Sequence, residues 1–169
     1  MDDRRIVIVG FMGSGKTTVA RALSRELNCE MIDLDSIITE SQRRSPAAII
    51  QEEGETFFRE IETLLLRDVL QNRTVRVIAL GGGTWTIPAN RTLIALHDCW
   101  TIWLDAPFEL CWQRITAGGD TVRPLAPNRA DAMKLYESRS RDYSLVHLRQ
   151  VIGYGDSAEV VAEQILTQT

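Results

Sequence analysis

The sequence predicts an α/β fold in which a parallel sheet carries helices on both faces. Short apolar runs alternate along the chain with longer stretches at helical spacing, which is typical of repeated strand–helix–strand units. The first apolar run, "IVIV" at residues 6–9, is unbroken, as in a strand that is buried on both faces. A glycine-rich turn joins it to a helical stretch. Ligands of such sheets bind beyond the carboxyl ends of the strands, so we expect the functional residues there.

The turn after the first strand, "GFMGSGKT" at residues 10–17, has the spacing Gly, four residues, Gly-Lys-Thr. Glycines allow a tight turn whose N–H groups form a nest for anionic oxygens, and the helix predicted at residues 16–27 aims its positive end into that nest. Lys16 can reach the outer phosphates, and the Thr17 hydroxyl can bind Mg²⁺. An ordinary turn is the alternative, but the full spacing favours a P-loop that binds a nucleoside triphosphate.

The second strand, predicted at residues 30–32, leads into "DLD". Asp33 and Asp35 lie two positions apart, so their side chains point the same way in an extended chain. One carboxylate could hold the water shell of a metal ion while the other orients or deprotonates a hydroxyl. Asp35 could equally cap the helix that follows, and the residues alone leave both interpretations open. Helices are predicted at residues 36–42 and 46–53.

A longer helix is predicted at residues 55–70, and it begins with "GETFFREIE" from Gly54 onward. Glu55, Arg59 and Glu62 lie along one flank of it, which taken alone indicates a surface ion pair. The buried stripe of this helix consists of Phe58, Ile61, Leu65 and Val69.

Three successive glycines, Gly81, Gly82 and Gly83, directly follow a strand predicted at residues 75–80. Glycines at a strand end allow close approach of the backbone to a ligand, and a plain turn needs only one or two. The elements predicted next are a helix at 88–96, a strand at 100–104 and a helix at 108–116.

The stretch "ITAGGDTVRPLAPNR" interrupts the alternation of strands and helices at residues 115–129. It is rich in glycine and proline and carries Arg123 and Arg129, so we interpret it as a loop that can move as a lid. The chain is predicted to end with a strand at 149–152 and a helix at 158–166.

Arg139 lies within a helix predicted at residues 129–146, and 3–4 spacing puts it on an otherwise apolar face. A guanidinium at such a place is costly unless it meets an anion. Asp142 on the next turn could be that anion. An anionic ligand is the alternative, because arginine suits a carboxylate through two parallel hydrogen bonds. The apolar residues of this face are Leu135, Tyr136 and Tyr143.

The length of 169 residues predicts a single domain, here spanning 1–169. A net charge of −4 argues against a nucleic-acid partner held by bulk electrostatics, and the run at residues 6–9 is too short to span a membrane. Three cysteines without metal spacing favour reduced thiols in a cytoplasmic protein. We therefore expect no nucleic acid and no membrane among its partners.

Taken in order, "GFMGSGKT", "DLD", "GETFFREIE", "GGG", "VRPL" and "RSRDY" resemble the shikimate kinases, small P-loop kinases of the nucleoside-monophosphate-kinase fold group. The resemblance implies a three-layer P-loop fold with a five-stranded parallel sheet in the order 2-3-1-4-5. It also implies a substrate-binding helical region at about 34–62 and a mobile lid at about 117–128. The implied activity is phosphorylation of the shikimate 3-hydroxyl by ATP with Mg²⁺, in aromatic amino-acid biosynthesis. We also expect the protein to be a monomer.

Three groups of site residues follow from this resemblance. Those implied for the nucleotide are Gly13, Ser14, Gly15, Lys16, Thr17, Thr18 and Arg114, with Thr17 and Asp33 also serving the metal. Those implied for the substrate are Asp35, Arg59, Gly81, Gly82, Gly83 and Arg139, the two arginines holding its carboxylate. Those implied for catalysis are Lys16, Asp35 and the lid residue Arg123.

Three other functions stay open at this point. Gluconate kinases share the fold and take a substrate with a carboxylate and hydroxyls, but "DLDSII" lacks their Asp-Gly-Asp segment. A GTPase switch is suggested by "NRAD" at residues 128–131, although that signature should follow a buried strand. A non-catalytic nucleotide-binding regulator would have lost Asp35 or Arg123, and both are present.

Overall fold

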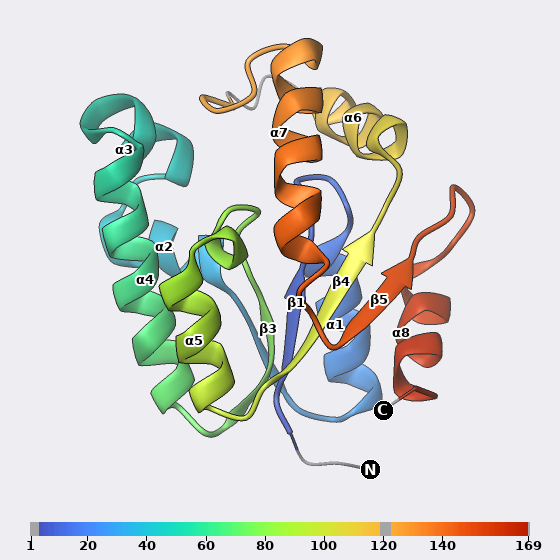
Figure 1. Cartoon of the computed structure of the whole chain (residues 1–169). Coiled ribbons are helices and arrows are strands. Elements are labelled where there is room, and N and C mark those ends of the chain that lie inside the picture. The colour runs from blue at the N-terminus through green and yellow to red at the C-terminus, as the bar shows by residue number, and fades with distance from the viewer. Residues whose placement is uncertain (1–3, 119–122, 169) are drawn as a thin grey trace.

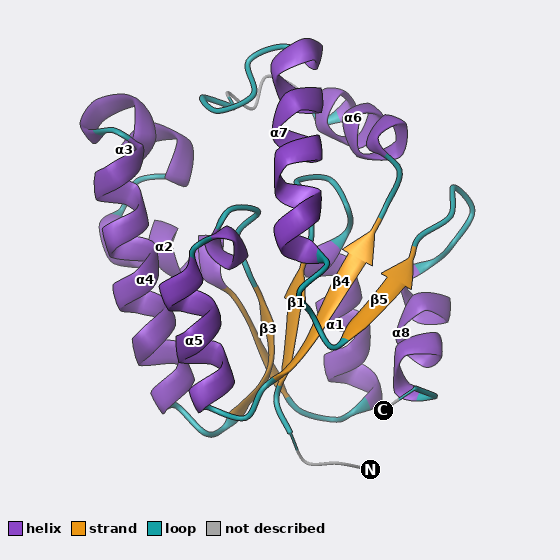
Figure 2. Cartoon of the chain, in the orientation of Figure 1, coloured by secondary structure: helices purple, strands orange, loops and turns teal. Residues whose placement is uncertain are grey.

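The computed structural model, which describes residues 4–118 and 123–168, contains five parallel strands in the order β2-β3-β1-β4-β5 (Figures 1 and 2). This confirms the predicted sheet order. Val7 at the centre of the sheet is in register with Ile78 on one side and Thr101 on the other. The strands are β1 (Ile6–Val9), β2 (Glu30–Asp33), β3 (Val75–Ala79), β4 (Trp100–Asp105) and β5 (Leu148–Val151).

Helices cover both faces of this sheet, as the three-layer prediction requires. Figure 1 shows α1 and α8 together on one face, with α4, α5 and α7 on the other. A 3₁₀ turn, η1 (Thr84–Thr86), was not predicted. The helices are α1 (Lys16–Glu26), α2 (Leu34–Gln42), α3 (Pro46–Glu53), α4 (Glu55–Gln71), α5 (Pro88–Leu96), α6 (Phe108–Ala117), α7 (Arg129–Tyr143) and α8 (Ala158–Leu166).

The core lies along the central strand. All four residues of β1 are buried, because helices pack on both faces of the sheet, and this explains why the run is unbroken rather than alternating. Each such aliphatic side chain stabilises the fold by about 1.5–3 kcal/mol on burial. A rigid β1 in turn fixes the start of the P-loop at the carboxyl edge of the sheet.

The helix predicted at residues 129–146 ends earlier, at Tyr143. The chain then turns, and the backbone N–H of His147 donates to the carbonyl of Thr101 at 3.1 Å, while the His147 ring contacts the Thr101 hydroxyl at 2.8 Å. These contacts align the start of β5 with β4. His147 therefore has a structural role next to the sheet.

The "NRAD" segment has a local explanation. Asn128 is the N-cap of α7, and its side-chain oxygen accepts from the backbone N–H of Asp131 at 3.0 Å. This capping accounts for the asparagine and aspartate without a guanine site. Residues 119–122 of the predicted lid lie outside the described residues. Within the described part of the chain, no helix has the length and hydropathy needed to cross a bilayer.

Candidate active site

The P-loop adopts backbone angles that require its glycines. Gly10, Gly13 and Gly15 have φ of 149°, 77° and 96°, where side chains are strained. A Cβ on Gly13 would also lie 2.6 Å from the carbonyl oxygen of Cys111, so this turn packs directly on α6. Lys16 is the first residue of α1, and its Nζ donates to the carbonyl of Phe11 at 2.9 Å. The ammonium is thus held across the mouth of the loop.

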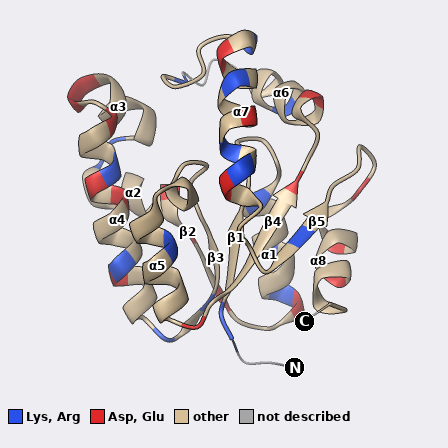
Figure 3. Cartoon of the chain, in the orientation of Figure 1, with Lys and Arg blue, Asp and Glu red and all other residues tan. Residues whose placement is uncertain are grey.

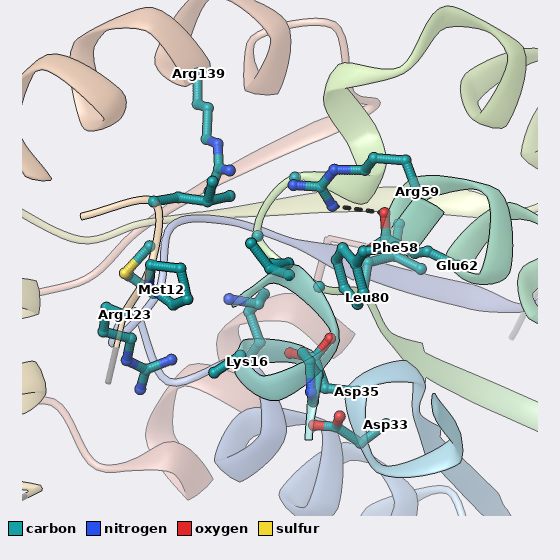
Figure 4. A pocket seen from close by; sticks show the side chains of 18 of the residues that line it. Met12, Lys16, Asp33, Asp35, Phe58, Arg59, Glu62, Leu80, Arg123 and Arg139 are labelled. Atoms are coloured by element: carbon teal, nitrogen blue, oxygen red, sulfur yellow. Dashed lines mark hydrogen bonds and ion pairs between the residues drawn. The ribbon is translucent and has the colours of Figure 1, made fainter. Parts of the chain in front are cut away.

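Next to the P-loop, at the carboxyl edge of the sheet, lies a cavity of about 270 Å³ (Figure 4). Its walls come from the P-loop, the ends of β2 and β3, helices α2 to α4, the chain after residue 122, and α7. It brings together the predicted residues Gly13, Lys16, Thr17, Asp33, Asp35, Arg59, Gly81, Gly82, Gly83, Arg123 and Arg139.

The two aspartates reach this cavity by a different geometry from the predicted one. β2 ends at Asp33 and α2 begins at Leu34, so the two carboxylates do not share an extended strand. Asp33, not Asp35, caps α2, with its Oδ1 accepting from the Ser36 N–H at 3.2 Å. Asp35 lies in the first helical turn and lines the cavity. The interpretation of Asp35 as the cap was therefore wrong.

Thr17 and Asp33 form the oxygen-rich corner of the site, because the Thr17 hydroxyl donates to Oδ2 of Asp33. In the described residues no cluster of three or more His, Cys, Asp or Glu could hold a metal ion. Mg²⁺ in phosphoryl-transfer sites keeps several waters and takes only one or two protein oxygens in addition to the phosphates. A hydroxyl and a carboxylate next to a phosphate-binding loop fit that donor set.

Burial shifts the pKa values of Asp35 and Lys16 toward each other. The pKa of Asp35 is raised to about 6, first by burial and then by the neighbouring charges of Asp33 and Glu62. Burial lowers the pKa of Lys16 to about 8, an effect partly offset by Asp35 and Asp33. Asp35 is therefore a better proton acceptor than an ordinary aspartate, and it is still ionised at neutral pH.

Arg59 is paired on both sides, as its flank position on α4 indicated. Its Nη1 donates to Glu62 at 2.6 Å, while Nε and Nη2 face Glu55 at 3.2 and 3.1 Å. Burial lowers the pKa of Arg59, but these carboxylates outweigh burial and raise it overall. Glu62 is fully buried whereas the Glu55 side chain is 48% exposed, so Glu55 is the partner that a ligand can replace.

Arg139 has no such partner. Asp142 contacts Arg91 at 3.4 Å instead, and within residues 4–118 and 123–168 no carboxylate is in ion-pair distance of Arg139. The side chain is nevertheless buried, and burial lowers its pKa. It lies beside Tyr143, whose hydroxyl donates to the Gly82 carbonyl. In Figure 4, Arg139 and Arg59 approach the cavity from α7 and α4. Figure 3 shows both basic and acidic bands on α7 and on α4.

The three glycines after β3 each face a charged side chain. A Cβ on Gly81 would lie 2.7 Å from Glu62 Oε1 and 2.8 Å from Asp35 Oδ1. One on Gly82 would lie 3.1 Å from Nη1 of Arg139, and one on Gly83 would lie 2.6 Å from Cζ of Arg59. The triple glycine is therefore explained by close approach to the site's own side chains.

A second pocket of about 240 Å³ opens on the other side of the P-loop. Arg114 lines it and donates from Nη1 to the Gly13 carbonyl at 3.1 Å. The loop before α8 contributes Asp156, which is itself bonded to the Gly153 N–H at 2.7 Å. The predicted nucleotide residues found in this pocket are Ser14, Gly15, Thr18 and Arg114.

Some contributors to the site were not predicted as such. Glu62 was expected only in a surface ion pair, yet it is fully buried and lines the cavity. Its position three residues after Arg59 on the same helix is the feature of the sequence that could have indicated this contact. Nothing in the pattern marked the apolar lining, which includes Met12, Phe58 and Leu80.

A P-loop, an acid beside an oxygen-rich corner and two converging arginines define a small kinase of an anionic metabolite. The family model described as "Shikimate kinase" matches residues 12–169. The shikimate kinase of Lactococcus lactis subsp. cremoris (strain MG1363) is 36% identical, covering 95% of this chain and 94% of the relative. That of Synechococcus elongatus (strain ATCC 33912 / PCC 7942 / FACHB-805) is 37% identical, covering 95% and 84%.

Among solved structures, the shikimate kinase from Acinetobacter baumannii in complex with shikimate has a TM-score of 0.88 and 31% identity. The similarity covers 98% of this chain and 92% of that one. The chain belongs to the shikimate kinase family, and it is an enzyme of the P-loop kinase fold.

The raised pKa of Asp35 predicts a pH-dependent stability. The folded pKa of about 6 exceeds the ordinary 3.8, so the folded state retains a proton that the unfolded state releases. Stability therefore falls as the pH rises through this window. We expect Asp35→Asn to be more stable than wild type at pH 7 by about 1–3 kcal/mol, as measured by urea unfolding.

Most of this advantage should be lost by about pH 4, where Asp35 is protonated in the folded state and about half protonated in the unfolded state. Asp68→Asn, at an exposed position of α4, is the matched control and should change little at either pH. A gain that is the same at pH 4 and pH 7 would contradict the assignment.

Proposed function

We propose that this enzyme transfers the γ-phosphoryl group of ATP to the 3-hydroxyl of shikimate. The observation that carries the proposal is the carboxylate-free Arg139, which is buried at the wall of the cavity with Arg59 nearby. A buried guanidinium without a carboxylate is costly, and an anionic substrate removes that cost. The family membership and the similarity to a shikimate-bound kinase support the choice of acid.

The nucleotide would lie along the P-loop, with its base in the pocket that Arg114 lines and its outer phosphates at Lys16. Backbone N–H groups of the loop and the positive end of α1 hold the phosphate oxygens. Phosphate charge beside Lys16 raises its pKa back from about 8, so the ammonium stays protonated in the complex. Thr17 and Asp33 would hold Mg²⁺, which neutralises charge on the phosphates when bound.

Asp35 would orient the acceptor hydroxyl and take its proton. In-line phosphoryl transfer depends mostly on positioning, and the base assists as the new oxygen–phosphorus bond forms. The proton moves from the hydroxyl to the Asp35 carboxylate, while the γ-phosphoryl group leaves ADP for the hydroxyl oxygen. Since Asp35 must be ionised to do this, we expect kcat/KM to decline below about pH 6, the pKa of the group.

The substrate carboxylate would be held between Arg139 and Arg59. Nη1 of Arg59 would still donate to Glu62, whereas the half-exposed Glu55 would be displaced from the Nε and Nη2 edge of Arg59. Two parallel hydrogen bonds from that edge are the geometry that arginine offers to a carboxylate. The region at about 34–62 would thus contribute both Asp35 and Arg59 to one substrate.

Arg123 would complete the site from the lid. It is exposed and lines the edge of the cavity. An arginine supplied in cis stabilises charge on the transferring phosphoryl group. A single domain, a moving lid at about 117–128, a cytoplasmic location and a monomeric state stay predictions.

The direct test of the function is a coupled ADP-release assay with shikimate, quinate, gluconate and nucleoside monophosphates as acceptors. We expect turnover with shikimate to exceed that with every other acceptor, because the two arginines and Asp35 match one carboxylate and a hydroxyl. Lys16→Ala is the inactive control. Preferential turnover of gluconate would overturn the substrate, and no ADP release with any acceptor would favour the non-catalytic regulator.

The carboxylate clamp predicts a loss that is specific to the acid. Arg139→Ala should weaken shikimate binding by a factor of tens to thousands, as removing one partner of a buried charge pair costs about 2–5 kcal/mol. Arg139→Lys should also bind shikimate weakly, since an ammonium cannot donate two parallel hydrogen bonds to a carboxylate. Isothermal titration with shikimate and its methyl ester measures this.

The ester should bind wild type and Arg139→Ala about equally poorly. Equal weakening of acid and ester in Arg139→Ala would show instead that Arg139 supports α7. Asp142 is not the partner in that case either, because it contacts Arg91.

Arg123→Ala should depress turnover much more than shikimate affinity. A cis arginine acts on the transition state and is worth up to about 10³–10⁵ in rate. Steady-state kcat and equilibrium shikimate titration on the same preparation separate the two effects. Arg129→Ala, a neighbouring exposed arginine paired with Glu109, is the control and should stay near wild type. Parallel losses of turnover and affinity in Arg123→Ala would mean that Arg123 only shapes the cavity.

A further inference from the structure

Thr84, the residue directly after the triple glycine, is connected to the substrate arginine through one buried carboxylate. Its hydroxyl donates to Oε1 of Glu62 at 2.6 Å, and Oε2 of the same carboxylate accepts from Nη1 of Arg59 at 2.6 Å. Thr84 and Glu62 are both fully buried. Each oxygen of the carboxylate therefore has a different partner, and together the two bonds fix its plane.

Thr84 is itself held firmly. Its backbone N–H donates to the Gly81 carbonyl at 3.2 Å, and its carbonyl accepts from the Asn90 side chain at 3.0 Å. Threonine is stiff at χ1, so the hydroxyl has a defined direction once the backbone is fixed. The hydroxyl belongs to the same turn whose glycines form the cavity wall.

The other partner of Arg59 does not supply this constraint. Glu55 is on the same helix and its side chain is 48% exposed, so it is free to sample other rotamers. The terminal torsion of a glutamate is broad, and without a second bond the Glu62 carboxylate would rotate. The Thr84 hydroxyl is thus the contact that ties Glu62, and through it Arg59, to the glycine turn.

We propose that Thr84 is a positioning residue for substrate binding, acting through Glu62 to orient the guanidinium of Arg59 toward the acceptor's carboxylate. This inference rests on the proposed role of Arg59 in holding that carboxylate. Thr84 has no part in phosphate binding or proton transfer, and its effect should appear in shikimate affinity rather than in ATP affinity.

The test compares Thr84→Val, which keeps the shape and removes the hydroxyl, with Thr84→Ser, which keeps the hydroxyl. We expect Thr84→Val to raise the Kd and KM for shikimate about 5- to 50-fold, because a buried carboxylate oxygen loses its donor. The Kd for ATP should stay within about twofold, and Thr84→Ser should recover most of the shikimate affinity. Where Thr84→Val does not fold, Thr84→Ala takes its place.

Thr101→Val is the matched control. Thr101 is also buried and its hydroxyl also has one side-chain partner, His147, but it lies on β4 away from the cavity. It should lower stability without changing shikimate affinity. Equal losses of affinity in the Thr84→Val and Thr101→Val proteins would overturn the inference, as would a Thr84→Ser protein as impaired as Thr84→Val.

A double-mutant cycle with Arg59→Ala separates this inference from the proposed function. In the Arg59→Ala background, Thr84→Val should add less than about a twofold loss, because the guanidinium it orients is gone. If Arg59→Ala binds shikimate more weakly and Thr84→Val binds it normally, the inference about Thr84 is overturned while the proposed clamp stands. Normal shikimate affinity in Arg59→Ala overturns the proposed clamp and the inference with it.

Discussion

The structure depends on the close approach of one backbone turn to several charged side chains. The glycines Gly81–Gly83 have no Cβ to keep Asp35, Glu62, Arg139 and Arg59 at a distance, and a side chain at any of the three would push one of them away. None of these glycines has the positive φ that the P-loop glycines need, so space rather than backbone freedom is the constraint. Groups from α2, α4 and α7 can therefore converge on the carboxyl edge of a sheet that β1 anchors.

Crowding these charges together has an electrostatic consequence. Burial disfavours every isolated charge, so it raises the pKa of Asp35 and lowers those of Lys16 and Arg139. Arg59 escapes this because Glu62 and Glu55 compensate it. In the unliganded site, Arg59 on α4 is paired with carboxylates, the burial of Lys16 on α1 is only partly offset by Asp35 and Asp33, and Arg139 on α7 has no carboxylate partner among the described residues. Two anionic ligands, one beside Lys16 and one beside Arg139, would balance these cations, and this is what the proposed nucleotide and acid supply.

The alternation of apolar runs and helical stretches predicted the parallel sheet and the eight helices, because strand and helix type depend on local periodicity, whereas the sheet order came from the resemblance to a known family. The local pattern did not predict which of two possible partners a side chain binds. Asp33 rather than Asp35 caps α2, since the sequence does not tell at which residue of "DLD" the strand ends and the helix begins. Asp142 pairs with Arg91, which lies 51 positions away in the sequence and was invisible to helical spacing. Thr84 gave no signal, because a threonine after glycines looks like an ordinary turn.

The residues of the P-loop are divided between the two pockets that lie on either side of it. Gly13, Lys16 and Thr17 line the cavity that holds Asp35, whereas Ser14, Gly15 and Thr18 line the pocket of Arg114. In the proposed complex, a triphosphate laid along this loop would begin in one pocket and end in the other, with its terminal phosphate next to the proposed acceptor base. The position of the phosphate donor would then be set by a rigid turn between β1 and α1. Since misplacement by about 1 Å can cost two orders of magnitude in rate, this rigidity accounts for much of what such a site must provide.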